Sequence, residues 1–168
     1  MKKILLISDT HSHIDESILK HVKAADEVWH AGDIGAINVA DTIQKLKPFR
    51  AVHGNIDDAQ VRLSFPEHLF FSCEGLPVLI LHIVGKPGNY IPLAKKLISQ
   101  YRPRLFICGH SHILNISRNT SPPLLHMNPG AAGIYGFHTT RTMIRFEVSL
   151  GKIQNVEVIE IERSKQST

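Results

Sequence analysis

Polar side chains of the kind that bind metal ions follow five short apolar runs in this chain of 168 residues. Each run ends in aspartate, asparagine or histidine, often directly after a glycine. The candidate metal-ligating side chains are Asp9, His11, Asp33, Asn55, His82, His110 and His112. Imidazole, carboxylate and amide oxygen together suit borderline-to-hard divalent ions such as Mn, Fe or Zn. The sequence therefore predicts a divalent metal site.

The number of candidate ligands favours two ions over one. Seven groups are more than a single ion can use while leaving room for a substrate. Two ions about 3.5–4 Å apart, bridged by one carboxylate and a hydroxide, would use them all. His110 and His112 are two residues apart, so on an extended loop they can face different ions. No cysteine belongs to the set, which argues against a structural zinc site.

Each signal is weak by itself. A single His82 is more often a core histidine than a ligand, and Asn55 after Gly54 is often just a turn residue. The prediction depends on their joint occurrence at the ends of five apolar runs. The remaining histidines divide into ordinary helix or loop residues and candidates for orienting the ligands. The first group is His21, His68 and His138, and the second is His13, His30, His53 and His126.

The apolar runs of the first third are predicted to be buried strands that alternate with helices. Strands are expected over residues 3–8, 27–30 and 50–53, with helices over 14–25 and 37–46. This alternation predicts right-handed crossovers and a parallel sheet. Because the carboxyl ends of such strands share one edge, the candidate ligands should converge there.

The rest of the chain is predicted to be richer in strands. An antiparallel pair is expected at 68–73 and 77–82, then a helix over 90–101 and a buried strand over 104–108. Four further strands are expected at 112–117, 124–127, 140–150 and 152–161, the last two forming a hairpin. Residues 162–168 are predicted to be a flexible tail. The length and the lack of a linker predict a single domain over residues 1–168.

Composition excludes several classes of protein. Hydrophobic residues make up 43% and charged residues 20%, as in ordinary globular proteins. The longest apolar stretch, residues 76–84, is too short to cross a membrane. The apolar run after Met1 stops at Asp9, too early for a signal peptide. We therefore expect a cytoplasmic protein without a membrane partner, in which Cys73 and Cys108 are reduced core residues.

Charge is unevenly distributed along the chain. The formal net charge is +4, and residues 85–168 carry 11 Lys and Arg against 4 Asp and Glu. This excess is either solvated surface or a positive rim for an anionic substrate. No basic cluster with interleaved aromatic residues indicates a dedicated nucleic-acid groove.

The candidate ligands also resemble a known signature. Asp9-x-His11, Gly32-Asp33, Gly54-Asn55, His82 and Gly109-His110-x-His112 resemble the motifs of calcineurin-like metallophosphoesterases. Ser8-Asp9-Thr10-His11 and Asn128-Pro129-Gly130 resemble the small prokaryotic phosphodiesterase branch of that superfamily, and the resemblance covers residue 3 to about 160. It implies an α/β fold, a four-layer α-β-β-α sandwich of two mixed sheets flanked by helices.

The resemblance also implies a mechanism. It assigns Asp9, His11, Asp33 and His112 to one ion, and Asp33, Asn55, His82 and His110 to the other, with Asp33 bridging. The expected activity is that of a metal-dependent phosphodiesterase acting on a small phosphate ester, by in-line attack of a hydroxide that bridges the two ions. Manganese is the first expectation for the two ions, with zinc, iron or nickel as alternatives. Asp33, Asn55 and His110 are the expected catalytic residues.

Two positions depart from the family's pattern. Many members have a histidine after the asparagine, but Ile56 cannot donate a proton, so monoesters with poor leaving groups should react slowly. His13 is a candidate substitute acid. The stretch His82-Ile83-Val84 replaces a common His-Gly-His and makes the neighbouring pocket bulkier and more apolar. A phosphomonoesterase or nucleotidase using the same site, and a non-catalytic scaffold resembling a retromer subunit, remain alternatives. A homo-oligomer is also open.

Overall fold

The first strand, β1 (Lys2–Ile7), has alternate side chains in two separate hydrophobic cores. In the computed structural model, which describes residues 1–163, Ile4 and Leu6 lie in one buried cluster and Leu5 and Ile7 in another. A strand that is apolar on both faces must be covered on both. A second sheet covers one face of β1, and helices cover the other.

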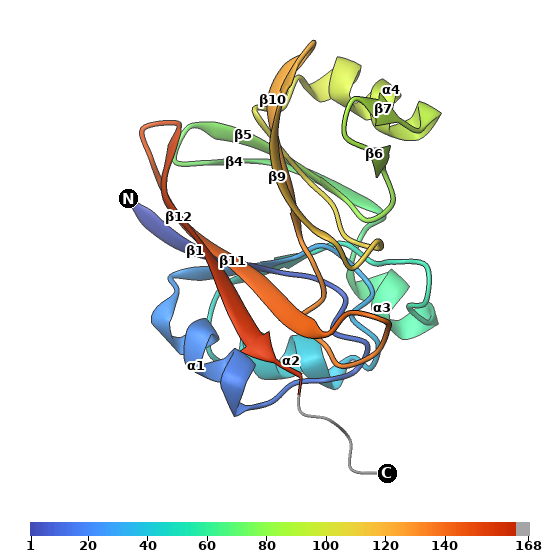
Figure 1. Ribbon diagram of the computed structural model, residues 1–168, viewed down its shortest axis with the longest axis vertical. Helices are drawn as coiled ribbons and strands as arrows, with labels where there is room; N and C mark the ends of the chain where they lie inside the picture. Colours follow the sequence, from blue (N-terminus) through green and yellow to red (C-terminus); the bar gives the residue numbers. More distant parts are fainter. Residues whose placement is uncertain (164–168) are drawn as a thin grey trace.

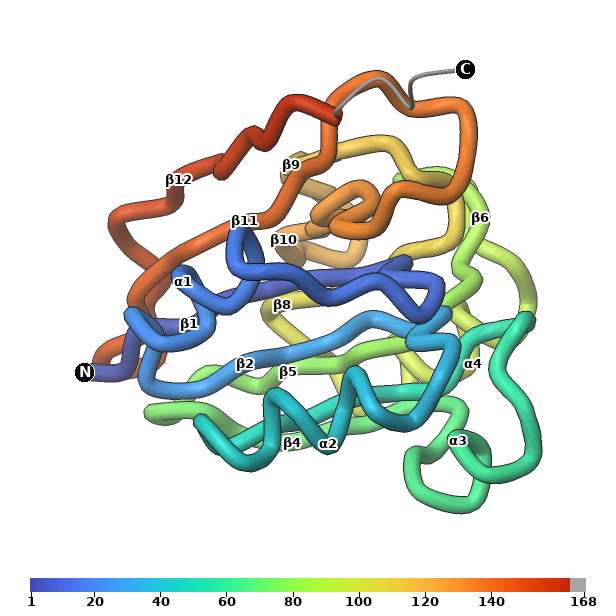
Figure 2. Tube along the Cα trace, turned by 90° about the horizontal axis from the view of Figure 1, so that it is seen from below, coloured from blue at the N-terminus to red at the C-terminus, as the bar shows by residue number. Residues whose placement is uncertain are grey.

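β1 is the middle strand of a mixed five-stranded sheet with the order β12-β11-β1-β2-β3. β2 (Glu27–His30) and β3 (Phe49–Ala51) continue the sheet in parallel. The crossovers contain α1 (Glu16–Ala24) and α2 (Asn38–Gln44), which lie in front of the strands in Figure 2. The predicted alternation of strands and helices is therefore confirmed in the first third of the chain.

The other half of this sheet is the hairpin of β11 (Thr140–Ser149) and β12 (Lys152–Glu162), which pairs antiparallel with β1. The hairpin was predicted, but the predicted tail began one residue too early. Glu162 pairs with Thr140 as the last residue of β12. The rest of the predicted tail, from residue 164, lies outside the described residues.

The second mixed sheet also has five strands, in the order β4-β5-β8-β10-β9. Its first two strands are antiparallel, as predicted, and β5, β8 and β10 run parallel to one another. The strands are β4 (His68–Cys73), β5 (Leu76–Leu81), β8 (Leu105–Ile107), β9 (Leu114–Thr120) and β10 (Pro123–Pro129). Helix α4 (Pro92–Tyr101) connects β7 to β8.

Three short elements were not predicted. They are α3 (Ala59–Ser64) and the two-stranded ladder of β6 (Gly85–Lys86) and β7 (Asn89–Tyr90). α3 has six residues, and only Val61 is buried, so it has no hydrophobic periodicity that a sequence could display. The boundaries of the elements that were predicted lie within three residues of those observed.

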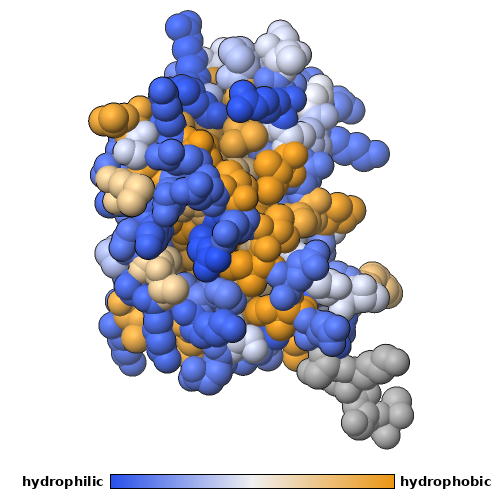
Figure 3. Space-filling view, turned by 60° about the vertical axis from the view of Figure 1, so that its left-hand side comes forward, coloured by the Kyte–Doolittle hydropathy of each residue, from blue (hydrophilic) through white to orange (hydrophobic). Residues whose placement is uncertain are grey.

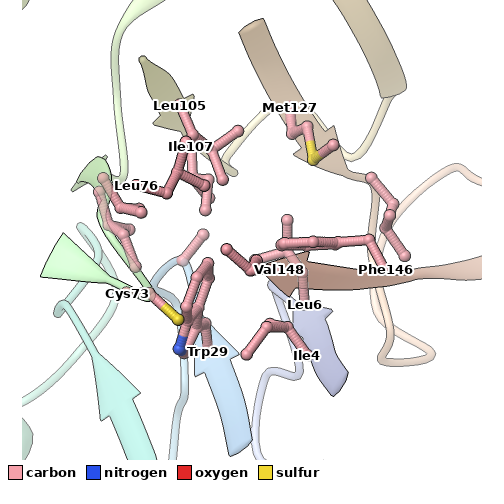
Figure 4. Close-up of a cluster of buried hydrophobic side chains, with 14 of the residues drawn as sticks. Ile4, Leu6, Trp29, Cys73, Leu76, Leu105, Ile107, Met127, Phe146 and Val148 are labelled. Carbon is pink, nitrogen blue, oxygen red and sulfur yellow. The ribbon is translucent and has the colours of Figure 1, made fainter. Parts of the chain in front are cut away.

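Three hydrophobic clusters separate four layers, which can be followed from bottom to top in Figure 1. The cluster between the sheets contains Trp29, Ile107 and Phe146 (Figure 4). A second packs α1 and α2 on the first sheet, and a third packs α4 on the second sheet. The α-β-β-α sandwich is therefore confirmed. None of the helices in residues 1–163 has the length and hydrophobicity of a membrane span.

The two sheets present their edge strands β12 and β9 on the same side of the molecule (Figure 2). Figure 3 shows hydrophobic side chains gathered midway up this side. The exposed apolar residues of the two edge strands are Ile116, Val156 and Val158. Apolar side chains are thus exposed at this side of the molecule, in addition to those buried in the three cores.

Candidate metal centre

The chain segments after β1, β2, β3, β5 and β8 meet at one end of the sandwich, and all seven predicted ligands lie there. They form two neighbouring groups. The first consists of Asp9, His11 and His112, and the second of Asp33, His82 and His110 with Asn55 beside them. Each group takes residues from both sheets, because His82, His110 and His112 follow strands of the second sheet.

In the first group, two imidazole nitrogens face one carboxylate. The Nε2 atoms of His11 and His112 are 3.3 Å apart, and they lie 3.8 and 3.3 Å from Asp9 Oδ1. The ligand atoms lie within 4.8 Å of one another. A cation among these atoms would satisfy two nitrogen lone pairs and one carboxylate oxygen at once.

Asp9 has one oxygen without a hydrogen bond although its side chain is fully buried. Asp9 Oδ2 accepts hydrogen bonds from the Ser8 hydroxyl and the His110 N–H, whereas Oδ1 accepts none among the described residues. Burial alone would raise the pKa of Asp9, but the His11 and His112 imidazoles outweigh it and hold this pKa well below its usual range. A buried carboxylate oxygen that is ionised and unpaired is costly unless a cation binds it. The residues present therefore fit a metal ion.

In the second group, His82 is oriented by the backbone. Its Nδ1 lies 2.7 Å from the Ala31 carbonyl oxygen, which can only accept, so Nδ1 carries the proton and Nε2 is free to bind a metal. That Nε2 lies 3.2 Å from Asp33 Oδ1 and 3.1 Å from Asn55 Oδ1. Burial lowers the pKa of His82, but the two aspartates raise it by more, which shows the negative field that a divalent cation would meet.

Asp33 lies between the two groups. Its Oδ2 is 3.6 Å from His11 Nε2 in the first group, and its Oδ1 is 3.2 Å from His82 Nε2 in the second. The Ile56 N–H also donates to Oδ1, at 3.1 Å. The side chain therefore offers one oxygen to each group, as a bridging carboxylate requires.

Most of the candidate ligands have a left-handed backbone, which non-glycine residues rarely adopt. Asp9, His11, Asp33, His110 and His112 have φ angles of 53°, 44°, 54°, 70° and 58°. Each such residue costs on the order of 1–2 kcal/mol, and the conformation persists only where neighbouring contacts impose it. Two of these contacts are the hydrogen bonds from Asp9 N to Gly32 O and from His11 N to Asp33 O, both 3.0 Å.

Glycines precede ligands because the ligands pack directly on them. A Cβ at Gly54 would lie 2.0 Å from Asp33 Oδ1, and a Cβ at Gly32, which has a φ of +101°, would lie 2.5 Å from His82 Nδ1. Both separations are far below van der Waals contact. The glycines in the Gly-Asp and Gly-Asn pairs are therefore needed for close approach between ligand loops.

His30, one of the residues predicted to orient the ligands, forms hydrogen bonds to two of the loops that contain them. Its Nδ1 accepts a hydrogen bond from Gly32 N at 3.1 Å, so Nε2 carries the proton and donates to Thr10 Oγ1 at 2.9 Å. Burial lowers the pKa of His30 to about 4, so the ring is neutral near pH 7. His30 thus connects the loop of the first strand with that of the second.

Asp57 was not assigned a role from the sequence, although it lies two residues after Asn55. Its buried carboxylate accepts hydrogen bonds from the N–H groups of Ile34, Gly35 and Gly54, at 3.2, 2.7 and 2.7 Å. These bonds hold the Asp33 loop against the Asn55 loop. The only sequence signal is an aspartate close to a ligand, which is common in turns.

A second support lies behind Asp9. Arg141 donates to both carboxylate oxygens of Asp15, at 2.8 and 3.2 Å, and to Ala132 O at 2.7 Å. Ala132 N in turn donates to Ser8 O. Burial alone would raise the pKa of Asp15, but hydrogen bonds from Arg141, His13 and the Ile18 N–H hold it well below its usual range.

The other histidines are placed differently from one another. His13 Nε2 lies 3.0 Å from Asp15 Oδ2, so the candidate substitute acid is engaged with a carboxylate that also binds Arg141. His138, interpreted from the sequence as an ordinary loop residue, packs edge-on against His112, with ring centroids 5.4 Å apart. In the same loop the Tyr135 ring lies 4.9 Å from that of His11. Neither contact has a sequence signal, because the loop is far from the ligands along the chain.

Comparison with known proteins gives consistent results. A model described as the calcineurin-like phosphoesterase superfamily domain matches residues 1–151. A "Probable metallophosphoesterase" of Methanothermobacter thermautotrophicus is 27% identical over 131 residues, which cover 75% of this chain and 74% of that protein.

Solved structures share the fold at lower identity. A structure described as a novel archaeal phosphodiesterase has a TM-score of 0.72 at 21% identity, covering 94% of this chain and 99% of that one. Vps29 from Entamoeba histolytica, complexed with Zn²⁺, has a TM-score of 0.71 at 16% identity, covering 96% and 99%. The fold is thus common to a phosphodiesterase and to a vacuolar protein sorting protein.

Proposed function

This chain belongs to the calcineurin-like phosphoesterase superfamily, and we propose that it is a phosphodiesterase that uses two divalent metal ions. The observation that carries the proposal is that the two groups of candidate ligands are neighbours and share one aspartate. Two groups of metal-binding side chains lie next to each other, and Asp33 offers one oxygen to each. This arrangement suits two ions that act on one phosphate.

Under this proposal, the residues divide between the ions. Asp9, His11, Asp33 and His112 would hold one, and Asp33, Asn55, His82 and His110 the other. The unpaired Asp9 Oδ1 and the metal-facing Nε2 of His82 support this assignment. When bound, the ions would neutralise the phosphoryl oxygens and lower the pKa of a water molecule, so that it loses a proton to solvent near neutral pH and a hydroxide is available to attack phosphorus. Manganese fits this mixture of nitrogen and oxygen ligands, as do zinc, iron and nickel.

The charge of the ligand set favours binding of an anion. Only two of the seven side chains, Asp9 and Asp33, are carboxylates, so two divalent ions would leave the site positive. Asn55 contributes a neutral amide oxygen, which preserves that positive charge. His110 is the exposed member of its group, and we assign it to contact the phosphate as well as the ion. Asp33, Asn55 and His110 are the proposed catalytic residues.

Preference for diesters over monoesters is supported by the residue after Asn55. Ile56 is 46% exposed beside the site, and its apolar side chain cannot protonate a leaving alkoxide. His13 Nε2 lies 3.0 Å from Asp15 Oδ2 and is held by that carboxylate. Monoesters with poor leaving groups, which need an acid most, should therefore react slowly. Faster hydrolysis of monoesters than of diesters would instead favour a phosphomonoesterase.

The second candidate is a non-catalytic scaffold, which the vacuolar protein sorting neighbour favours because it has the same fold. A scaffold does not require that all seven positions carry side chains able to bind metal. It predicts that no divalent ion produces hydrolysis.

The test is hydrolysis of bis(p-nitrophenyl) phosphate and p-nitrophenyl phosphate by chelator-treated protein, with Mn, Ni, Zn or Mg added separately. Both substrates have good leaving groups, so the apolar Ile56 should not conceal activity. We expect metal-dependent cleavage with the diester preferred. Asp33→Asn should lower the rate by about a thousand-fold or more and weaken binding of both ions, measured by elemental analysis. Full activity of Asp33→Asn, or no hydrolysis with any metal, would overturn the proposal.

A further inference from the structure

Apolar side chains surround the candidate metal centre where a charged or polar surface would be expected. Three isoleucines each directly follow a ligand in the sequence, and two aromatic residues belong to the segment 133–138, called here the aromatic loop. The exposed fractions are 46% for Ile56, 37% for Ile83, 67% for Ile113, 68% for Tyr135 and 107% for Phe137. Exposed apolar residues that cluster at one site indicate a surface that binds something.

Two hollows lie on either side of His110. One, of about 550 Å³, is lined by His110, His112, Ile113, Tyr135 and Phe137. The other, of about 300 Å³, runs from His110 towards Ile83, Ile91 and the buried His126. His110, Ser111 and Ile113 line both, so the two hollows meet beside one of the proposed metal ligands.

The hollows contain little charge. Of the residues that line them, Lys86 alone is a lysine or arginine, and none is an aspartate or glutamate. A substrate with a second phosphate would require more cations than this. The lining instead matches organic groups that are uncharged.

The aromatic loop is fixed at its base while its rings remain exposed. His138 Nε2 donates to Gly133 O at 2.9 Å, and Arg163 donates to the carbonyl oxygens of Gly136 and His138 at 2.7 and 3.0 Å. A Cβ at Gly136 would lie 2.5 Å from His112 Nδ1, so the loop packs directly on a ligand. The structure therefore holds Phe137 beside the site although the fold does not bury its ring.

We propose that the two hollows bind the two ester groups of a phosphodiester. The larger hollow takes the ester group that is not the leaving group, and the aromatic loop stacks on that group when it is planar and aromatic. The inference rests on the proposed function, because that function puts the phosphate beside His110, where the hollows meet. The substrate class is a diester with a single phosphate and uncharged ester groups, of which the one that is not the leaving group is aromatic. Tyr135 and Phe137 are then specificity-determining residues.

The test compares two diesters with the same leaving group, bis(p-nitrophenyl) phosphate and methyl p-nitrophenyl phosphate. Phe137→Ala should lower kcat/KM for the first by about 3- to 10-fold, the range that one aromatic stacking contact supplies, and leave the second within about two-fold. Leu150→Ala is the matched control, because Leu150 is 91% exposed in the turn between β11 and β12. An equal loss on both diesters, or no loss on either, would overturn the inference.

A binding measurement separates this inference from the proposed function. Calorimetry of the manganese-loaded protein should show tighter binding of diphenyl phosphate than of dimethyl phosphate, and Phe137→Ala should reduce this difference by about 3- to 10-fold. If the wild type binds in this way but hydrolyses neither diester, the aromatic subsite stands and the proposed hydrolase fails. Equal affinity of the wild type for the two phosphates would overturn the subsite even if hydrolysis is observed.

Discussion

The two ends of the sandwich both contain residues with a left-handed backbone, but for different reasons. At the end away from the ligands, two tight turns close hairpins, and Glu74-Gly75 and Leu150-Gly151 have positive φ at both positions. This is the geometry of two-residue hairpin turns, with glycine second. At the ligand end, Ser12 and several glycines have positive φ, but so do five aspartates and histidines whose side chains converge. An unusual φ indicates function only where it aims a side chain that can do chemistry.

The ends also differ in which side chains they bury. At the ligand end, Asp9, Asp33 and His82 are almost completely buried, whereas Ile113 and Phe137 are exposed. This reverses the usual distribution of polar and apolar residues. At the other end, Glu74, Gly75 and Leu150 are exposed, and the two turns touch through a hydrogen bond from Gly151 N to Glu74 O. The reversal is costly for folding, and the proposed binding of metal and substrate would explain why it is kept.

The strongest way to test this comparison is to add one methyl group at the ligand end. Gly54→Ala puts a Cβ about 2.0 Å from Asp33 Oδ1, so the Asp33 side chain, the proposed bridge, must move. We expect phosphodiesterase activity to fall by about a hundred-fold or more, because displacement of a reacting group by about 1 Å costs that much. Steady-state kinetics with added manganese, alongside circular dichroism, measures this. Unchanged kinetics would mean that Asp33 is not held as tightly as we infer.

Substitution of single candidate ligands tests whether the two groups bind separate ions. His110→Ala and His112→Ala should each lose about one equivalent of metal, because the two side chains belong to different groups. Elemental analysis after dialysis against buffer containing Mn measures the content. His21→Ala, on α1, is the control and should retain both ions. Loss of both ions in each variant would show that the groups bind cooperatively, and loss of neither would refute the assignment.

An effect of pH on stability should arise behind the ligand end. The pKa of Asp15 is lower in the folded chain than in the unfolded one, because Arg141, His13 and the Ile18 N–H outweigh its burial. The stability that this group contributes is therefore complete above about pH 4, the pKa of an unperturbed aspartate, and is lost as pH falls. Asp15→Asn should cost about 2 kcal/mol at pH 7 and flatten the acid limb of the curve. Urea unfolding of the wild type and of Asp15→Asn from pH 2 to pH 7 measures this effect. If the free energy of unfolding falls in parallel in both proteins as the pH is lowered, the prediction is contradicted.

The smallest effect is expected from the same methyl addition at the opposite end. A Cβ at Gly75 meets nothing closer than 3.6 Å, but its φ of +81° strains any other residue. Gly75→Ala should therefore lower the free energy of unfolding by about 1–2 kcal/mol and leave kcat/KM unchanged. Thermal unfolding and the diester assay on one preparation measure both. A loss of activity like that of Gly54→Ala would remove the distinction between the ends.

The features that could be predicted from the sequence are those that depend on residues close together in the chain. An apolar run followed by a ligand residue identifies both a buried strand and the group at its end, as in the segment that ends at Asp33. Asp57 could not be identified, because its carboxylate binds the backbone of the Asp33 loop, which is distant in the sequence, and its own neighbours do not reveal this. Tyr135 and His138 reach the site because the connection between β10 and β11 crosses it, which is a property of topology. Helix α3 is too short to display periodicity.

Because the candidate ligands follow strands of both sheets, a bound metal ion would have a mechanical role. One group joins Asp9 and His11 of the first sheet to His112 of the second, and the other joins Asp33 to His82 and His110. Each ion would thus act as a clamp across the core that Trp29 and Phe146 fill. By thermodynamic linkage, whatever loosens the contact between the sheets must also weaken metal affinity, and whatever binds metal must resist their separation. The metal content of a variant would then report how firmly the two sheets pack against each other.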